Sequence, residues 1–238
     1  MNAAGPVIPN FGKASSCVVD NHLFCWGWVR DNWSGTLQPA LVQHLELSAI
    51  AVGIGFAIAF AAALLAHRHG WFERPFGVFS AFLYTIPSIA LFQLLVPVTG
   101  LTRTSVEIAL VGYTLLILFR NILAGLRAVP PDVLEAARGM GLTRLQTLLR
   151  VELPLALPAV VAGLRIAVVT VVSLATIAAV ILPQGLGFPI FVALRSDFFK
   201  TEIIAAGGLA VALALVADAL LVLAQRALTP WARTRRPA

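Results

Sequence analysis

The chain is dominated by long apolar stretches that are separated by short polar segments. A helix needs about twenty apolar residues to cross the roughly 30 Å hydrocarbon core of a membrane. Five stretches come close to this length or exceed it: residues 47–66, 75–102, 105–126, 155–182 and 203–225. Pro87 and Pro97 interrupt the second stretch, and Glu107 and Arg120 lie near the two ends of the third. The pattern therefore predicts five transmembrane helices.

The composition supports a membrane protein and excludes an ordinary soluble domain. Hydrophobic residues make up 59% of the chain, charged residues only 12%, and the mean hydropathy is +0.90. A length of 238 residues suits one domain. We expect an all-α polytopic membrane protein with an extracytoplasmic N-terminal tail (1–44), a transmembrane domain (45–226) and a cytoplasmic C-terminal tail (227–238).

The basic residues predict the orientation in the membrane. Five spans place the two termini on opposite sides, so the 17 lysines and arginines fall into two sets of twelve and five. The larger set belongs to the side of the C-terminus, and positive residues are retained in the cytoplasm. We therefore expect the N-terminus outside and the C-terminus inside. The net charge of +6 reflects this topology, and because no basic nucleic-acid-binding motif is present, nucleic acid is not an expected partner.

Both cysteines lie in the N-terminal tail, within the sequence CVVDNHLFC. On the oxidising side of a membrane Cys17 and Cys25 can form a disulfide. The alternative is a pair of buried thiols beside Trp26, Trp28 and Trp33. With only two cysteines and no cluster of histidines, a metal site is not expected.

A polar passage between the third and fourth apolar stretches has strong helix start and stop signals. Pro130 and Pro131 end the preceding helix, and Asp132 with Glu135 has the spacing of a capping box. Gly139 and Gly141 follow, and each costs a helix interior about 1 kcal/mol relative to alanine. The passage therefore begins with a short helix that ends in a glycine turn.

A second short helix is predicted after the turn. Thr143 and Gln146 again have the spacing of a capping box, and Leu153-Pro154 is expected to end this helix. An apolar face that can lie on the bundle is expected from five leucines: Leu134, Leu142, Leu145, Leu148 and Leu149. Glu135, Arg138 and Arg144 would then face water or a partner protein.

The spacing of this passage resembles the EAA loop of ABC importer permeases. Its residues are Glu135-Ala136-Ala137, Gly141, and Leu153-Pro154, with Val151 in place of the usual isoleucine. The stretches YTIPSIALFQLLVPVTG, FRNILAGL and FCWGWVRDNW resemble the osmoprotectant branch, which imports glycine betaine, choline, carnitine or proline. The resemblance covers the chain from about residue 20 to about residue 225.

The resemblance implies a type I ABC importer permease fold and an ATPase-coupling loop over residues 131–156. The coupling residues would be Glu135, Ala136, Ala137, Arg138, Gly141, Thr143, Arg144, Leu153 and Pro154. The implied partners are cytoplasmic ATPase subunits, which would carry ATP and Mg²⁺, an extracytoplasmic binding protein, and a second permease subunit, identical or different. The chain itself would hold no cofactor. It contains no G-x-x-x-x-G-K-[ST] phosphate-binding sequence, so we do not expect it to be an enzyme.

Two further groups are candidates for the solute path. Tyr84, Thr85, Pro87 and Ser88 form a polar patch in an apolar stretch, where freed backbone groups could line a cavity; alternatively, Pro87 only kinks a packed helix. Gly185 and Gly187 could form an outer gate. In this branch that loop resembles IGAGGLG, whereas here it is ILPQGLG, a departure that leaves the mode of gate closure open.

Glu107 and Asp218 are ionisable residues within or near the membrane, which by default suggests function, although Asp218 could equally pair with an arginine. The alternatives to an osmoprotectant importer are an ABC permease for another small solute, such as an amino acid or a sulfonate, and an ion-coupled secondary transporter. A secondary transporter usually has internal repeats, and no repeat is evident between the two halves. A membrane scaffold without transport would not need the polar passage.

Overall fold

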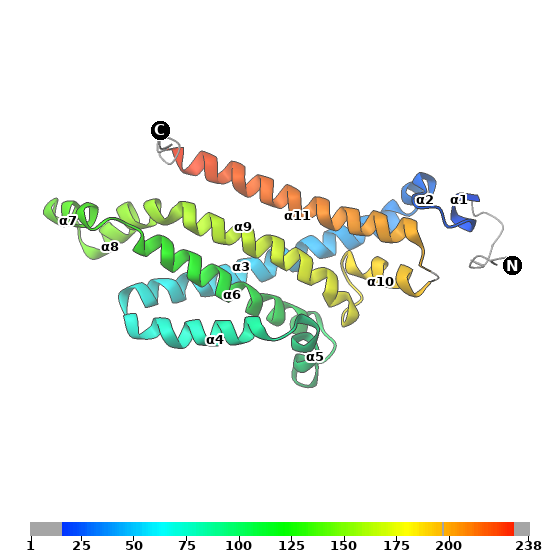
Figure 1. The fold of residues 1–238 in the computed structure, drawn as a ribbon, viewed down its shortest axis with the longest axis horizontal. Helices are drawn as coiled ribbons and strands as arrows, with labels where there is room; N and C mark the ends of the chain where they lie inside the picture. The colour runs from blue at the N-terminus through cyan, green and yellow to red at the C-terminus, as the bar shows by residue number, and fades with distance from the viewer. Residues whose placement is uncertain (1–15, 197, 231–238) are drawn as a thin grey trace.

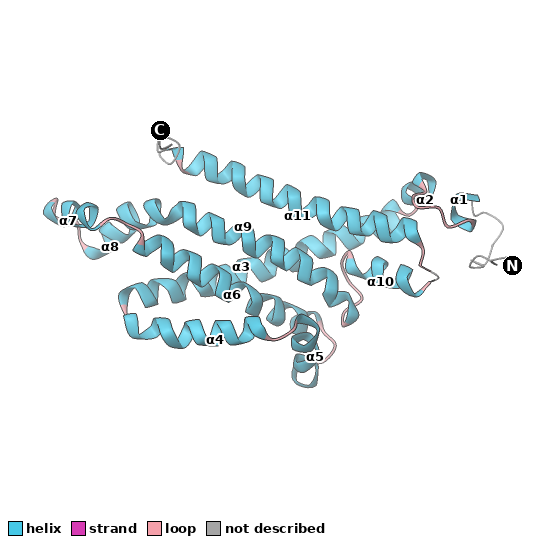
Figure 2. Ribbon diagram, viewed as in Figure 1, coloured by secondary structure: helices cyan, strands magenta, loops and turns pink. Residues whose placement is uncertain are grey.

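The computed structural model of the chain describes residues 16–196 and 198–230, and these are folded almost entirely as helices, without a strand (Figure 2). The helices, with short π-helical and 3-10 segments marked η, are α1 (Ser16–Val19), α2 (Trp26–Asp31), η1 (Trp33–Leu37), α3 (Gln38–Arg68), η2 (Gly70–Phe72), α4 (Glu73–Thr85), α5 (Ser88–Thr99), α6 (Arg103–Arg127), α7 (Pro131–Gly139), α8 (Arg144–Thr147), η3 (Leu148–Glu152), α9 (Leu153–Ile177), η4 (Ala178–Val180), α10 (Gly187–Arg195) and α11 (Lys200–Leu228). The all-α membrane architecture that the sequence predicts is confirmed.

Four continuous helices in the described residues are long and apolar enough to cross a membrane. They run over 33–68, 103–127, 144–180 and 200–228. The predicted second span, 75–102, is not one helix. It consists of α4 and α5, which meet at an angle of 102°. The residue before a proline is disfavoured in helical conformation, and the chain bends at Ile86-Pro87, where Ile86 is extended. The number of spans is five if this bent pair is taken as one.

Helix α6 lies in the centre of the bundle, between α3 and α9 (Figure 1). Glycines allow its neighbours to approach closely. A Cβ on Gly55 of α3 would lie 1.8 Å from the Thr114 hydroxyl oxygen, and a Cβ on Gly163 of α9 would lie 2.5 Å from that of Asn121. Close contacts between small residues are what associates helices in lipid, where the hydrophobic effect gives no preference for helix over lipid.

The bundle has two distinct ends. The α7–α8 passage and the C-terminal end of α11 lie at one end, whereas α1, α2 and α10 lie at the other (Figure 1). If the basic residues mark the cytoplasm as predicted, the first end is cytoplasmic and the second extracytoplasmic. Arg68, Arg127 and Arg138 all lie in helices that end at the α7–α8 end of the molecule.

Helix α3, the first helix long and apolar enough to cross a membrane, begins at Gln38 and is continuous with the π-helical turn η1, so the helix starts before residue 44, the predicted end of the N-terminal tail. Asn21 and Thr201 connect the preceding segment to the start of α11. The Asn21 amide donates to the Phe198 carbonyl at 3.2 Å and accepts from the Lys200 N–H at 3.0 Å. The buried Thr201 hydroxyl accepts from the Cys25 N–H at 3.0 Å.

Cys17 and Cys25 are joined by a disulfide, with 5.9 Å between their Cα atoms. The closed loop lies on α11 through Asn21, and just beyond it the Trp28 ring packs edge-on against Phe199, with 5.2 Å between the ring centroids. Val29 and Leu37 add a small buried cluster with Ala205 and Ala206 of α11. The disulfide loop therefore stabilises the N-terminal end of α11, although the two segments are far apart in the sequence.

We predict that replacing both Cys17 and Cys25 by serine lowers the free energy of unfolding by about 2–3 kcal/mol, since a disulfide constrains the unfolded chain. The measurement is thermal unfolding of the purified protein in detergent. The wild-type protein should lose the same stability on addition of a reductant, and its thiols should resist alkylation beforehand. Equal melting of oxidised and reduced protein would contradict the prediction.

Candidate functional site

The first helix of the polar passage, α7, begins one residue earlier than its predicted cap. Pro130 is the N-cap and Pro131 the first helical residue, so the predicted capping box of Asp132 and Glu135 does not form. Proline suits the first helical position because its missing N–H would have no helical partner there. Asp132 instead lies in the first turn, where its negative charge is favourable for the helix dipole. The side chain of Glu135 is therefore not used as a cap.

Helix α7 ends at the predicted glycine turn. Gly141 has a φ of +80°, a left-handed conformation that side chains other than glycine rarely adopt. The N–H of Gly141 donates to the carbonyl of Arg138 at 2.9 Å, and the N–H of Leu142 donates to that of Ala137 at 3.1 Å. These two bonds form a Schellman motif, which satisfies the last carbonyls of the helix. The turn is thus fully bonded through its own backbone.

The helix after the turn begins with a capping box, as predicted. The Thr143 hydroxyl accepts from the Gln146 N–H at 3.3 Å, and the Gln146 side chain accepts from the Thr143 N–H at 2.9 Å. The expectation that Leu153-Pro154 ends this helix is wrong, because α8, η3 and α9 form one helix over 144–180. The wider turns of η3, just before Pro154, accommodate a ring that would clash with the carbonyl four residues earlier in a regular helix.

The coupling residues named from the sequence lie together at this end of the molecule. The side chains of Glu135, Ala136, Arg138 and Arg144 are exposed, and only Ala137 is buried. The predicted apolar face is partly wrong. Leu134, Leu142 and Leu148 are half-buried, whereas Leu145 and Leu149 are 64% and 55% exposed, because the helix that carries them extends beyond the bundle. Met140 adds a further apolar side chain that is 72% exposed.

Tyr84, Thr85, Pro87 and Ser88 lie at the bend between α4 and α5, so Pro87 breaks the helix rather than kinking it. The bend frees the carbonyl of Ile86, which accepts a hydrogen bond from the hydroxyl of Tyr113 on α6. Tyr84 and Tyr113 also meet edge-to-face, with 6.0 Å between their ring centroids. Sequence reasoning missed Tyr113, and its only signal was a hydroxyl within an apolar stretch.

Gly185 and Gly187 form a tight turn between η4 and α10. Gly185 has a φ of +72°. A Cβ on Gly187 would lie 1.9 Å from the carbonyl oxygen of Thr176, so only glycine fits there. The turn is held by α3: the Gln43 side chain accepts from the Gly185 N–H at 3.1 Å, and Nδ1 of His44 accepts from the Leu186 N–H at 3.2 Å.

His44 was not singled out from the sequence, yet its side chain is completely buried. Because its Nδ1 accepts a hydrogen bond, the ring proton lies on Nε2, which donates to the Val172 carbonyl at 3.0 Å. One imidazole therefore links α3, the turn before α10, and α9. The signal that could have located it is a histidine in an apolar helix, where a polar group must find partners.

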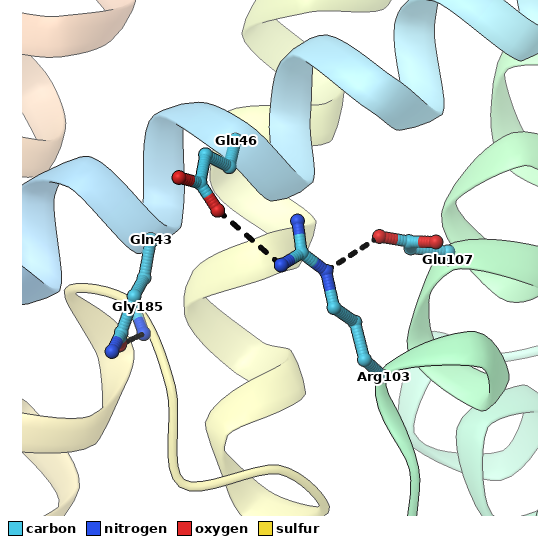
Figure 3. A network of polar contacts seen from close by, with 5 residues as sticks. All are labelled: Gln43, Glu46, Arg103, Glu107 and Gly185. Carbon is cyan, nitrogen blue, oxygen red and sulfur yellow. Dashed lines mark hydrogen bonds and ion pairs between the residues drawn. The ribbon is translucent and has the colours of Figure 1, made fainter.

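The same turns of α3 carry an ionic contact (Figure 3). Arg103, the first residue of α6, donates to Glu107 at 2.7 Å and to Glu46 of α3 at 3.3 Å. Asp218 of α11 pairs with Arg165 of α9 through two hydrogen bonds of 2.7 and 2.9 Å. Glu107 and Asp218 thus both form structural ion pairs, which neutralise charges within the spans.

Across the described parts of the chain, no group of three or more histidine, cysteine, aspartate or glutamate residues is arranged to hold a metal ion. The coupling residues, the α4–α5 bend and the Gly185 turn occupy three separate places along the bundle. Helix α6 connects the bend with the polar passage. The long helix that contains α9 connects the polar passage with the Gly185 turn.

Comparison with known proteins places this architecture in a family. The sequence model of the family of binding-protein-dependent transport system inner membrane components matches residues 40–234. The osmoprotectant import permease protein OsmW of Salmonella typhimurium is 38% identical over 209 residues, which cover 85% of this chain and 96% of that protein. The choline transport system permease protein OpuBB of Bacillus subtilis is 32% identical over 200 residues, covering 82% and 90%.

The fold is also similar to that of solved transporters. An inward-facing structure of the MetNI methionine ABC transporter matches with a TM-score of 0.68 and 19% identity, and the match covers 84% of this chain and 97% of that one. At this identity the likeness concerns the fold. With the family model matching most of its length, this multi-pass membrane protein belongs to the inner membrane components of binding-protein-dependent transport systems.

Proposed function

We propose that the chain is the permease subunit of an ATP-driven importer for osmoprotectants such as glycine betaine, choline, carnitine or proline. The observation that supports this most directly is the exposed helix α7, which ends in a Schellman motif at the basic end of a permease fold. The substrate class rests on the relatives, whose names specify osmoprotectants and choline.

Helix α7 suits a mechanical contact with a cytoplasmic ATPase subunit. Its C-terminal end is satisfied by backbone hydrogen bonds and its N-terminal end uses no side-chain cap, so the side chains of Glu135, Arg138 and Arg144 remain available to a partner. Exposed Met140 and Leu145 supply apolar area for such an interface. Because the helix after the turn continues without interruption to Val180, a displacement at α7 would be transmitted along a rigid element to the turn at Gly185.

The partners follow from this role. ATP and Mg²⁺ would bind to the ATPase, a binding protein would deliver the solute outside, and a second permease subunit would complete the path. Helix α11 leaves a large apolar surface exposed along one side, including Val211, Leu215 and Leu220 at 60–65%, which suits lipid or a second permease. A secondary transporter driven by protons is less well supported, because Glu107 and Asp218 are each paired with an arginine.

The turn at Gly185 is proposed as the outer gate, held by His44. We predict that His44→Leu leaves the Leu186 N–H unpaired, at a cost of about 1–3 kcal/mol, while the Val172 carbonyl keeps the hydrogen bond from the Thr176 hydroxyl. Thermal stability in detergent and solute uptake should both decrease. Leu41→Ala, on the same helix, removes apolar contact without disturbing these hydrogen bonds and serves as the control; uptake at wild-type level in His44→Leu would contradict a role of the turn in gating.

The proposed orientation predicts which residues are accessible from outside. In a variant with both native cysteines replaced, a cysteine at exposed Ser34 should react with a membrane-impermeant reagent on intact cells. A cysteine at Met140 should react only after the membrane is opened, because α7 lies at the opposite end of the bundle. The reverse pattern would refute the orientation.

The glycine turn gives a test of coupling. Gly141→Ala keeps the side chain small but places it at a left-handed φ, which costs about 1–2 kcal/mol. Gly141→Leu adds a bulky side chain at the same position, where no atom of the chain lies within 4 Å. We therefore expect the leucine variant to insert normally but to lose ATPase binding and glycine betaine uptake together, and to a greater extent than the alanine variant.

Gly139→Ala is the matched control, because Gly139 has open space and an ordinary helical φ. Alanine there should favour α7 by about 1 kcal/mol and leave uptake intact. Glu135→Ala removes a side chain that caps nothing, so it should leave the melting temperature unchanged while weakening ATPase copurification. Wild-type coupling in Gly141→Leu would show that the passage is only a connector.

A further inference from the structure

A groove of about 660 Å³ lies between α4 and α6 in the half of the bundle nearest the α7 end. Its lining residues are Glu73, Arg74, Gly77, Val78, Ala81, Phe119, Arg120, Leu123, Ala124 and Arg127. The groove is open because Gly77 and Ala81 of α4 face Ala124 of α6 with little side-chain volume. The side of the groove formed by α4 is open to the surroundings, since the side chain of Val78 is 70% exposed.

The α4–α5 bend lies beyond the groove, along the same two helices. On α4, Gly77, Ala81 and Tyr84 follow one another at the three- and four-residue spacing that aligns side chains on one face of a helix. On α6, Tyr113 and Arg120 are seven residues apart, two turns along the same face. Tyr84 and Tyr113 meet edge-to-face beyond the groove, toward the α4–α5 bend; Tyr113 is buried, whereas Tyr84 is 42% exposed.

The charges in the groove are unequal. Glu73 is held by Arg127 through two hydrogen bonds of 2.8 and 2.5 Å, so its carboxylate is already neutralised, and Arg74 adjoins that pair. Arg120 is exposed, and within residues 16–196 and 198–230 it forms neither a hydrogen bond nor an ion pair. Three guanidinium groups therefore share one carboxylate in the groove, and Arg74 and Arg120 are left without a carboxylate partner among the described residues; Arg120 is the one that lies away from the helix end.

The position of Arg120 along α6 places its charge below the end of the helix. It lies seven residues before Arg127 on α6, which corresponds to about 10 Å at 1.5 Å per residue. A charged side chain at such a depth is costly in lipid, and such residues usually face a water-filled cavity or an opposite charge. Arginine binds carboxylates with two parallel N–H donors, so the ligand chemistry that fits Arg120 is a carboxylate.

We propose that Arg120 binds the carboxylate of a zwitterionic solute on the cytoplasmic half of its path, and so makes the permease itself sensitive to the acid group of the solute. This rests on the proposed function and adds a specificity residue to it. The exposed ring of Tyr84 lies beyond the groove, on the same face of α4 as Gly77 and Ala81, and aromatic faces attract quaternary ammonium groups. A betaine that passes Tyr84 would then reach Arg120, so each of its two charges would meet a partner in turn.

A lipid phosphate is the competing ligand for a guanidinium near the membrane surface. The arrangement favours a solute, because Arg120 lies deeper than the arginines at the mouth of the groove, of which Arg127 is paired with Glu73. Beyond the groove α4 ends at the bend before α5, so it does not offer an unbroken apolar helix surface to an acyl chain.

Glycine betaine and choline provide the test, because they share the quaternary ammonium group and only the betaine carries a carboxylate. Uptake of both is measured for the complete importer, with its ATPase and binding protein, in cells that produce equal amounts of permease. Arg120→Gln should lower betaine uptake roughly tenfold, the loss of one strong charged contact of about 1.4 kcal/mol, and change choline uptake less than twofold. Arg120→Lys should retain part of the betaine uptake.

Arg68→Gln is the matched control, because Arg68 is exposed at the same end of the bundle but outside the groove; it should affect neither solute. Equal losses for both solutes in Arg120→Gln, or no loss, would overturn the proposal. Equal losses that anionic lipid reverses in proteoliposomes would assign the groove to lipid instead. If the wild-type importer carries betaine alone, equal betaine uptake by the lysine and glutamine variants overturns it. A wild-type importer that carries neither solute refutes the proposed function, and this inference with it.

Discussion

The constraint on which the structure depends is that backbone polar groups in a bilayer must find partners within the protein. Regular helices meet it automatically, but the α4–α5 bend and the turn before α10 interrupt the helices of this chain. At the α4–α5 bend, the Tyr113 hydroxyl satisfies the freed carbonyl of Ile86. At the turn before α10, Gln43 and His44 accept the N–H groups of Gly185 and Leu186. In both places a side chain from another helix replaces the missing helical bond.

These replacement bonds connect the irregular segments to the rigid core. Tyr113 belongs to α6 and His44 to α3, two helices that pack closely through Gly55 and Thr114. A movement of α3 relative to α6 would therefore change the support of the bend and of the outer turn at once. Arg103, which reaches Glu46 across the same two helices, adds an ionic contact that would have to change with them.

The α7 turn meets the constraint differently, because it lies at the end of the bundle and is bonded through its own backbone. The Schellman motif at Gly141 and the capping box at Thr143 leave the side chains of Glu135, Arg138 and Arg144 without a structural role. The ion pairs in the spans have the opposite character, since Arg165 and Asp218 neutralise each other across α9 and α11. Arg120, by contrast, has no carboxylate partner among the described residues, and this distinguishes the α4–α6 groove from the paired sites.

Much of this was determined by the sequence alone. Apolar runs specify membrane helices because about twenty consecutive apolar residues are needed to cross the hydrocarbon core. Gly141 and Thr143 specify the turn and the helix cap because both depend on residues only a few positions away. Tertiary structure decided what depends on partners distant in sequence: the bend of 102° at Pro87, the continuous helix through Pro154, the attachment of the disulfide loop to α11, and the role of His44. Such contacts join residues up to 179 positions apart, and no local pattern records which helix will supply the missing hydrogen bond.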